Sequence, residues 1–155
     1  MRLITSLLQP EYVLLDLVVG SKNALFEAID ARLASTLGLA PQVIASSLAA
    51  REKLGSTGLG QGMAIPHGRI KQLRQAVGAF VRTRDAIPFG APDQAPVRLL
   101  FVLLAPEQAT DLHLQILSEL AQLFSNRALR ERLLHSNDAT QIFQLLTSAT
   151  LDGPA

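Results

Sequence analysis

The hydrophobic positions of the chain change spacing several times, which indicates a mixture of helices and strands. Ser21 can cap a helix that runs to Leu37, and Gly38 would end it. The apolar positions of this segment recur every four residues, as on one face of a helix: Leu25, Ile29, Leu33 and Leu37. Residues 97–105 are instead apolar at nearly every position, which is typical of a central strand covered on both faces.

The pattern of the whole chain predicts helices that alternate with strands. Strands are expected at residues 12–19, 58–66, 75–84 and 97–105. Helices are expected at residues 21–37, 41–54, 110–125, 127–135 and 139–148. No repeat, low-complexity segment or internal linker interrupts this pattern, and only residues 150–155 have the composition of a frayed tail. Such alternation predicts one layered α/β domain over residues 1–149.

Composition and charge narrow the classes of function. The 155 residues are 48% apolar and 17% charged, so a sizeable core is expected and disorder is not. Fourteen basic and thirteen acidic residues leave a net charge of +1 without a basic block, so nucleic acid is not an expected partner. The apolar stretch 99–105 is too short to cross a bilayer, and residues 1–5 lack a signal peptide's apolar run. With no cysteine, a cytoplasmic protein without membrane insertion is expected.

A glycine-rich segment, residues 58–68, carries the main candidate for chemistry, His67. Three glycines alternate with larger residues at its start, so an extended chain would leave one face bare for another molecule. Pro66 fixes its own φ, and Gly68 would let the chain turn directly after the histidine. An imidazole with a pKa of about 6.5 is largely neutral near neutral pH, so its free nitrogen can attack phosphorus without a separate base. The alternative is a structural histidine held by its surroundings.

Arg51 is the second candidate, because it continues the apolar stripe of the helix expected at residues 41–54. Ile44, Leu48 and Arg51 are spaced by four and three residues, so the arginine points inward at the end of this helix. A planar guanidinium can hold two phosphoryl oxygens at once. The alternative is an arginine whose stem covers apolar surface while its charged end reaches water or pairs with Glu52.

His113 is the third candidate and lies in the first turn of the helix expected at residues 110–125. It shares a helical face with Leu117, Leu120 and Phe124. A histidine in the middle of a buried stripe is either a core residue bonded to the backbone or a group that serves a site beside His67. Spacing alone leaves both possibilities open.

Other motifs in the chain are weaker. The glycine segment is neither a dinucleotide-binding motif nor a phosphate-binding loop, because no Gly-Lys-Ser/Thr follows at the required spacing. Two histidines could bind zinc, with a third ligand from Asp111 or a distant carboxylate. These residues do not have the spacing of a known metal-binding motif, so no metal is expected. Ser56 and Thr57 do not lie in a nucleophile-elbow sequence, and they are expected to supply hydroxyl or backbone contacts at the rim of the site.

Several segments together resemble one known family. These segments are residues 51–57 (REKLGST), 65–68 (IPHG), 86–89 (AIPF), 96–106 (PVRLLFVLLAP) and 112–114 (LHL). They resemble the IIA proteins of the bacterial phosphoenolpyruvate-dependent phosphotransferase system, in the mannitol/fructose superfamily and nearest to its nitrogen-regulatory branch. Gln61 stands where this branch usually has Asn. The resemblance implies an α/β/α sandwich with a mixed sheet of about five strands.

The resemblance also implies a function. His67 would carry a phosphoryl group on Nε2, accepted from a histidine-containing phosphocarrier protein, while Arg51 and His113 steady the phosphoryl oxygens and Gln61, Ser56 and Thr57 support them. No cofactor is implied. The phosphorylation state would control regulatory targets such as potassium transport or a sensor kinase. Two alternatives are a sugar-specific IIA component that passes phosphate to a IIB domain and a regulatory module that no longer carries phosphate.

Overall fold

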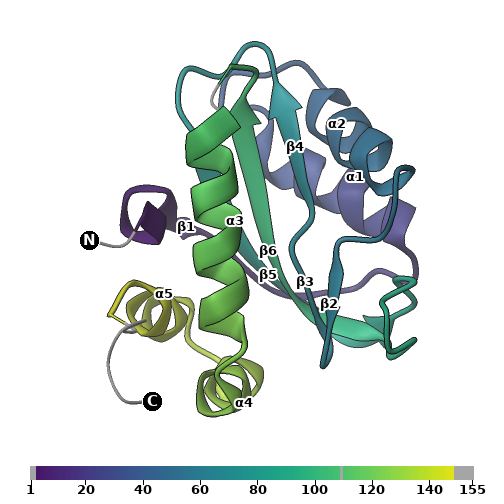
Figure 1. Ribbon diagram of the computed structural model, residues 1–155, viewed down its shortest axis with the longest axis vertical. Coiled ribbons are helices and arrows are strands. Elements are labelled where there is room, and N and C mark those ends of the chain that lie inside the picture. Colours follow the sequence, from purple (N-terminus) through teal and green to yellow (C-terminus); the bar gives the residue numbers. More distant parts are fainter. Residues whose placement is uncertain (1–2, 109, 149–155) are drawn as a thin grey trace.

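A mixed sheet forms the centre of the structure, a computed structural model that describes residues 3–108 and 110–148 (Figure 1). Within these residues the sheet has six strands: β1 (Leu8–Leu17), β2 (Gly58–Gly60), β3 (Met63–Ala64), β4 (His67–Ile70), β5 (Val77–Ile87) and β6 (Val97–Pro106). Their order is β1-β5-β6-β3-β2, and β4 also pairs with β6. Strands β5 and β6 are antiparallel, whereas β1 runs parallel to β5, and β3 and β4 run parallel to β6. The expected tail, residues 150–155, lies outside the described residues.

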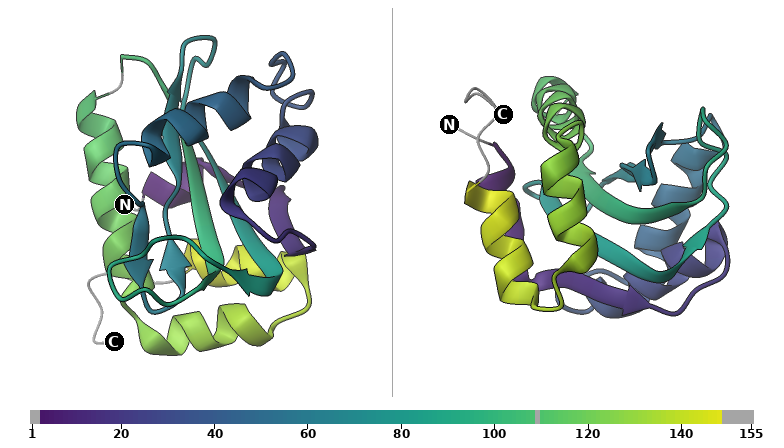
Figure 2. Two further views of the ribbon diagram at one scale, coloured as in Figure 1. Left: turned by 90° about the vertical axis from the view of Figure 1, so that its right-hand side faces the viewer. Right: turned by 90° about the horizontal axis from the view of Figure 1, so that it is seen from below.

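Helices cover both faces of this sheet (Figure 2). The described residues contain a short 3-10 helix and five α-helices: η1 (Leu3–Ser6), α1 (Lys22–Leu33), α2 (Val43–Glu52), α3 (Thr110–Phe124), α4 (Arg127–His135) and α5 (Ala139–Ser148). Apolar residues of α1 and α2 form one core cluster with the sheet, and those of η1, α3, α4 and α5 form a second. The layered α/β/α domain predicted from the sequence is confirmed, with six strands where about five were expected.

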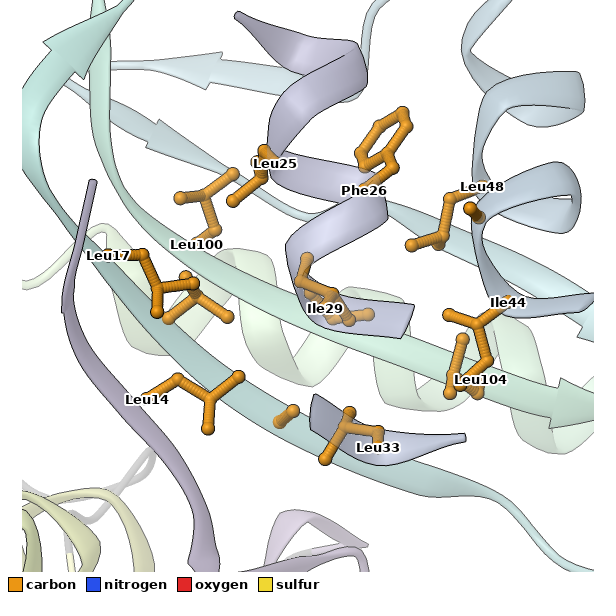
Figure 3. Packing of buried hydrophobic residues seen from close by; sticks show 14 of the residues in the cluster. Leu14, Leu17, Leu25, Phe26, Ile29, Leu33, Ile44, Leu48, Leu100 and Leu104 are labelled. Carbon is orange, nitrogen blue, oxygen red and sulfur yellow. The ribbon is translucent and has the colours of Figure 1, made fainter. Parts of the chain in front are cut away.

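Strand β6 lies between the two core clusters. Leu100 and Leu104 pack toward α1 and α2 (Figure 3), whereas Phe101 and Leu103 belong to the cluster beneath α3. Residues 99–105 are all buried, because alternate side chains of a strand point to opposite faces and both faces are covered here. The prediction of a central strand is confirmed.

The start of α2 differs from the prediction by two residues. Proline 41 was expected to be its first residue, but the helix begins at Val43. Two backbone N–H groups near this end, those of Gln42 and Ala45, donate to the carboxylate of Asp30 over 3.1 and 2.9 Å. Asp30 lies on α1 and is buried. The cap that fixes this boundary thus comes from another helix, which local sequence rules do not detect.

The prediction of one continuous strand at residues 58–66 is wrong, because the chain reverses direction within this segment. Gln61 and Gly62 have φ angles of 59° and 78°, and they connect β2 to β3 in an antiparallel hairpin. Left-handed residues at such a turn match the twist of the paired strands. Gly58 serves packing, since an added Cβ would lie 2.7 Å from Cβ of Ala91. The glycines therefore shape a hairpin and do not leave one face of an extended strand bare.

Candidate functional site

His67 is the first residue of β4, which packs beside α2. Its Nδ1 lies 2.9 Å from the carbonyl oxygen of Ile65, and its Nε2 lies 3.2 Å from Nε of Arg51. A guanidinium can only donate hydrogen bonds, so Nε2 must be the acceptor. Nδ1 then carries the hydrogen and donates it to Ile65. This tautomer leaves the lone pair of Nε2 facing Arg51.

Gly68 does not turn the chain after the histidine, as the sequence had suggested, because it lies inside β4. Its missing side chain instead lets α2 approach the strand. An added Cβ would lie 2.2 Å from Oγ of Ser47, and this hydroxyl donates to the carbonyl of Arg69 over 2.9 Å. The contact fixes the distance between the strand that carries His67 and the helix that carries Arg51.

Arg51 lies in the last turn of α2, at the inward position that its spacing predicted. Its Nη1 donates to the carbonyl of Gly55 over 2.8 Å, while its Nε donates to His67. The guanidinium is therefore held by two hydrogen bonds that differ in direction. Its orientation depends on the position of the loop that follows α2.

Glu52 anchors that loop, a role that its position in the sequence does not indicate. Its carboxylate accepts from Nζ of Lys22 over 2.8 Å and from the backbone N–H of Thr57 over 3.1 Å. The Thr57 hydroxyl also donates to it. Only 5% of the Glu52 side chain is exposed, and buried carboxylates are found where charge and hydrogen bonds compensate them. No local motif indicates this cluster, since Lys22 comes from α1.

Ser56 and Thr57 were expected at the rim of the site, but neither lines the pocket beside His67. The Ser56 hydroxyl donates to the carbonyl of Phe89 over 2.8 Å and accepts from the N–H of Gly58 over 3.0 Å. Thr57 binds Glu52. Both residues therefore hold the loop that positions Arg51.

His113 lies beside His67, with ring centroids 5.1 Å apart and planes inclined by 67°. The proximity predicted for these two histidines is confirmed. His113 is only 6% exposed, and its buried Nδ1 has no hydrogen-bond partner within the described part of the chain. Burial lowers the pKa of His113 to about 4, with the charges of His67, Arg69 and Arg51 acting in the same direction. Burial likewise lowers the pKa of His67, so both rings are neutral near neutral pH.

These side chains line one pocket of about 530 Å³. Its lining comprises Ser47, Ala50, Arg51, Leu54, His67, Gly68, Arg69, His113, Leu114 and Leu117. Arg69 was not identified as a site residue from the sequence. The sequence spacing could have indicated it. Residues two apart on a strand point to the same face, and Arg69 follows His67 by two residues. Gln61 is absent from this pocket, since it lies in the β2–β3 hairpin and lines two concave surfaces near α4.

The sequence of residues 6–149 matches the family described as "Phosphoenolpyruvate-dependent sugar phosphotransferase system, EIIA 2". The chain belongs to this family. It is 38% identical over 143 residues to the "Nitrogen regulatory protein" of Bradyrhizobium diazoefficiens, covering 92% of this chain and 94% of that protein. To the protein of the same name from Escherichia coli K12 it is 40% identical over 128 residues, covering 82% and 78%.

Solved structures of EIIA proteins agree with this assignment. The structure titled "Nitrogen Regulatory Protein IIA-Ntr from Neisseria meningitidis" has a TM-score of 0.89 and 48% identity, and the match covers 94% of this chain and 100% of that one. The mannitol IIA protein of Escherichia coli has a TM-score of 0.75 and 24% identity, over 90% and 98% of the chains, which shows a shared fold. The resemblance to the IIA family, nearest to its nitrogen-regulatory branch, is thus confirmed.

The EIIA family takes part in phosphoryl transfer, and two further properties of this chain bear on its chemistry. Among residues 3–108 and 110–148, no three His, Asp or Glu side chains gather closely enough to hold a metal ion. None of the helices in the same residues is both long and apolar enough to cross a membrane. The cations that line the pocket with His67 are the guanidinium groups of Arg51 and Arg69, and guanidinium groups bind phosphoryl oxygens without a metal.

Proposed function

We propose that the chain is a phosphoryl carrier in which Nε2 of His67 accepts a phosphoryl group from a phosphohistidine on a small phosphocarrier protein. One observation carries this proposal. Nδ1 of His67 is 2.9 Å from the Ile65 carbonyl while Nε2 is 3.2 Å from Nε of Arg51. The backbone thus fixes the tautomer, and the reactive lone pair lies beside a permanent cation.

The transfer balances without a separate acid or base. The Nε2 lone pair of His67 forms a bond to phosphorus, and the bond from phosphorus to the donor imidazole breaks. The electron pair of the broken bond stays on the donor nitrogen, so a protonated phosphoimidazole becomes a neutral imidazole. The proton of His67 stays on Nδ1, and its hydrogen bond to the Ile65 carbonyl stabilises the charge that the ring acquires. Positioning and electrostatics supply most of the catalysis in such a loose transition state.

Three neighbouring groups would steady the phosphoryl oxygens. Arg51 gives up its hydrogen bond to Nε2 when phosphorus arrives, and the same N–H then donates to an oxygen. Arg69 adds a second cation to the pocket. His113 is neutral in the free protein, and a nearby phosphoryl group of about −1.5 to −2 charge would raise its pKa until it donates as a cation.

The rim of the pocket supports transfer from another protein. Leu54 is 84% exposed and Leu114 is 63% exposed, and both line the pocket with His67. Exposed leucines around a reactive group are typical of a protein docking surface. A donor that covers them would exclude water from the phosphoryl group and limit its hydrolysis.

We further propose a regulatory output in the cytoplasm, in which the phosphorylation state of His67 controls binding to targets such as potassium transport or sensor kinase proteins. The relatives that match most of the chain are named nitrogen regulatory proteins, which supports this output. A sugar-specific role is the second candidate. The fructose-specific EIIA component of Haloferax volcanii is 35% identical over 100 residues, or 64% of this chain.

Phosphorylation can be tested by incubating the purified chain with phosphoenolpyruvate and the general phosphotransferase proteins. We expect the mass of one phosphoryl group on the chain, lost in acid and retained in alkali, because protonation makes a phosphoramidate nitrogen a better leaving group. His67→Ala should remove the label, whereas His135→Ala, at an exposed histidine, should retain it. Equal labelling of the His67→Ala variant would contradict the site. Absence of label on the folded wild-type chain would favour a regulatory module that does not carry phosphate.

The two phosphorylated roles can be separated with the labelled protein. A regulatory carrier should keep its phosphoryl group when mixed with IIB domains, and its binding to target proteins should depend on the label. Rapid transfer to a sugar-specific IIB domain would instead assign the chain to sugar uptake.

A further inference from the structure

A second concave surface lies at the other end of α3 from His113. It is formed by the β2–β3 hairpin, the start of β6, the end of α3 and helix α4, which meet in the lower part of Figure 1. Two adjoining hollows of about 490 and 400 Å³ share Gln61 and Arg130 as lining residues. Phe124 in this groove follows His113 by eleven helical residues, which places it on the order of 16 Å along the helix axis from that histidine. The groove is therefore separate from the His67 pocket.

Three arginines line this groove: Arg98, Arg127 and Arg130. Arg127 is exposed and, within the described residues, forms no hydrogen bond or ion pair. It is the first residue of α4, whose first turn contains no acidic residue. A cation at a helix N-terminus opposes the helix dipole. The stability of α4 therefore does not account for this arginine.

The other two arginines are anchored and still have N–H groups to spare. Nη1 of Arg130 donates to the carbonyl of Phe124 over 2.8 Å. Nε of Arg98 donates to the carbonyl of Thr83 over 2.9 Å, and its Nη2 lies 3.7 Å from Oδ1 of Asp16. Each guanidinium carries five N–H donors. Anchoring reduces the entropy that each would lose on binding a ligand.

The frame around these arginines is already formed. The hairpin turn is held by the backbone N–H of Gln61, which donates to the Asp93 carboxylate over 2.9 Å. The carbonyl of Gly62 also accepts from the backbone N–H groups of Arg98 and Leu99, each over 3.1 Å. The far end of α4 is held by the buried side chain of Arg82, which donates to the carbonyl of Leu133 over 3.0 Å. A ligand would thus meet a groove that needs little rearrangement.

The lining also includes an apolar part and few opposing charges. Leu59 is 42% exposed and supplies apolar surface to the groove, and the buried residues Met63, Phe124 and Leu99 lie beneath it. Glu131 is the acidic group among the lining residues, and it lies 3.4 Å from Nε2 of His135. The carboxylate of Asp93 is engaged by backbone N–H groups of Gln61 and Ala95. Because Asp16 pairs with Arg98, the excess positive charge of the groove comes from Arg127 and Arg130, and it lies beside apolar surface.

We propose that this groove is a second ligand site of the protein, for a small organic phosphate. A phosphate offers three oxygens and about −1.5 to −2 charge, which suits several guanidinium groups better than a single carboxylate does. Its organic part would contact the exposed side chain of Leu59, and the exposed Gln61 side chain would supply a further polar contact. The site binds its ligand without transfer of a group.

The proposal can be tested by NMR titration of the Arg51→Ala variant, in which phosphate binding at the His67 pocket is expected to be weaker. Phenyl phosphate is the probe, with inorganic phosphate, benzoate and benzyl alcohol for comparison. Phenyl phosphate should shift the amide signals of Gln61, Gly62 and Arg127 saturably and bind more tightly than the other three. Benzoate with equal affinity would overturn the assignment to a phosphate.

Helix α4 offers both a test variant and a matched control. Arg127→Glu should weaken phenyl phosphate binding by about tenfold to a hundredfold, the range expected for a lost charge-assisted hydrogen bond. Arg132→Glu should leave the affinity within about twofold, because Arg132 is also exposed on α4 but does not line the groove. The two chains have the same charge, so a general electrostatic effect would weaken both equally. Equal weakening, or shifts confined to residues around His67, would overturn the proposal.

Discussion

Nε of Arg51 donates a hydrogen bond to Nε2 of His67 over 3.2 Å. The lone pair that would attack phosphorus therefore already accepts a hydrogen bond from the guanidinium. This contact keeps the ring in one tautomer, because the Ile65 carbonyl holds the opposite nitrogen. It also means that the guanidinium must move slightly when a phosphoryl group arrives. The geometry of the guanidinium, as well as its charge, should therefore matter for transfer.

Arg51→Lys tests this dependence on geometry. Lysine retains the charge but cannot donate to His67 and to the Gly55 carbonyl in the same planar arrangement. We expect the transfer rate to fall by about tenfold to a hundredfold, the equivalent of a charge-assisted hydrogen bond, with little change in melting temperature. Rapid-quench phosphotransfer measures the rate, and Arg132→Lys is the control for an exposed arginine. A variant as fast as wild type would leave Arg51 with a structural role only.

Stability should depend on pH through His113. Its pKa in the folded protein is about 4, below the value of about 6.5 for an unfolded histidine. Between these values the unfolded chain binds more protons, so the free energy of unfolding falls as pH is lowered through this window. The loss attributable to His113 is about 3 kcal/mol. His67, whose pKa is also lowered, acts in the same direction.

Urea denaturation of wild type and His113→Gln at several pH values between 4 and 7 measures this loss. The variant should have a flatter pH dependence whatever its absolute stability, because glutamine does not titrate. Parallel curves for the two proteins would mean that the His113 pKa is not lowered by folding. His135→Gln serves as the control for an exposed histidine.

Glu52→Gln tests the charge and the loop contacts that Glu52 supplies near His67. The substitution removes the ion pair with Lys22 and the negative charge that raises the pKa of His67. We expect the His67 pKa to fall further, the free energy of unfolding to drop by about 1–3 kcal/mol, and phosphotransfer to slow. NMR titration of His67 is decisive, because a purely structural role would not move its pKa in this direction. Glu131→Gln is the matched control.

Gly68→Ala tests the close approach of β4 and α2. The new Cβ would lie 2.2 Å from Oγ of Ser47, so overpacking should cost about 1–3 kcal/mol of unfolding free energy. The double variant with Ser47→Ala should recover part of this loss, because the Ser47 Cβ and carbonyl carbon would still lie 3.1 Å away. Gly20→Ala, with no atom near its added Cβ, is the control. Strictly additive effects would contradict a direct contact.

The sequence by itself determined the class of fold and singled out the main candidate residues of the site. The apolar run of β6 and the periodicity of α3, α4 and α5 predicted those elements within one residue. These signals were strong because each segment buries its apolar positions in a simple pattern that local spacing records. The glycine and proline context singled out His67, and inward spacing singled out Arg51. His113 was identified as buried, but its place beside His67 came only from the family resemblance.

Tertiary structure decided the features that depend on contacts between distant segments. Asp30 of α1 sets the start of α2, and Lys22 of the same helix pairs with Glu52 beside the site. The segment expected as one strand divides into β2, β3 and β4, because it pairs with itself and with β6. That division moves Gln61 away from His67 and turns Arg69 toward it. Local spacing specifies the face on which a side chain lies, whereas packing across the sheet decides which side chains meet.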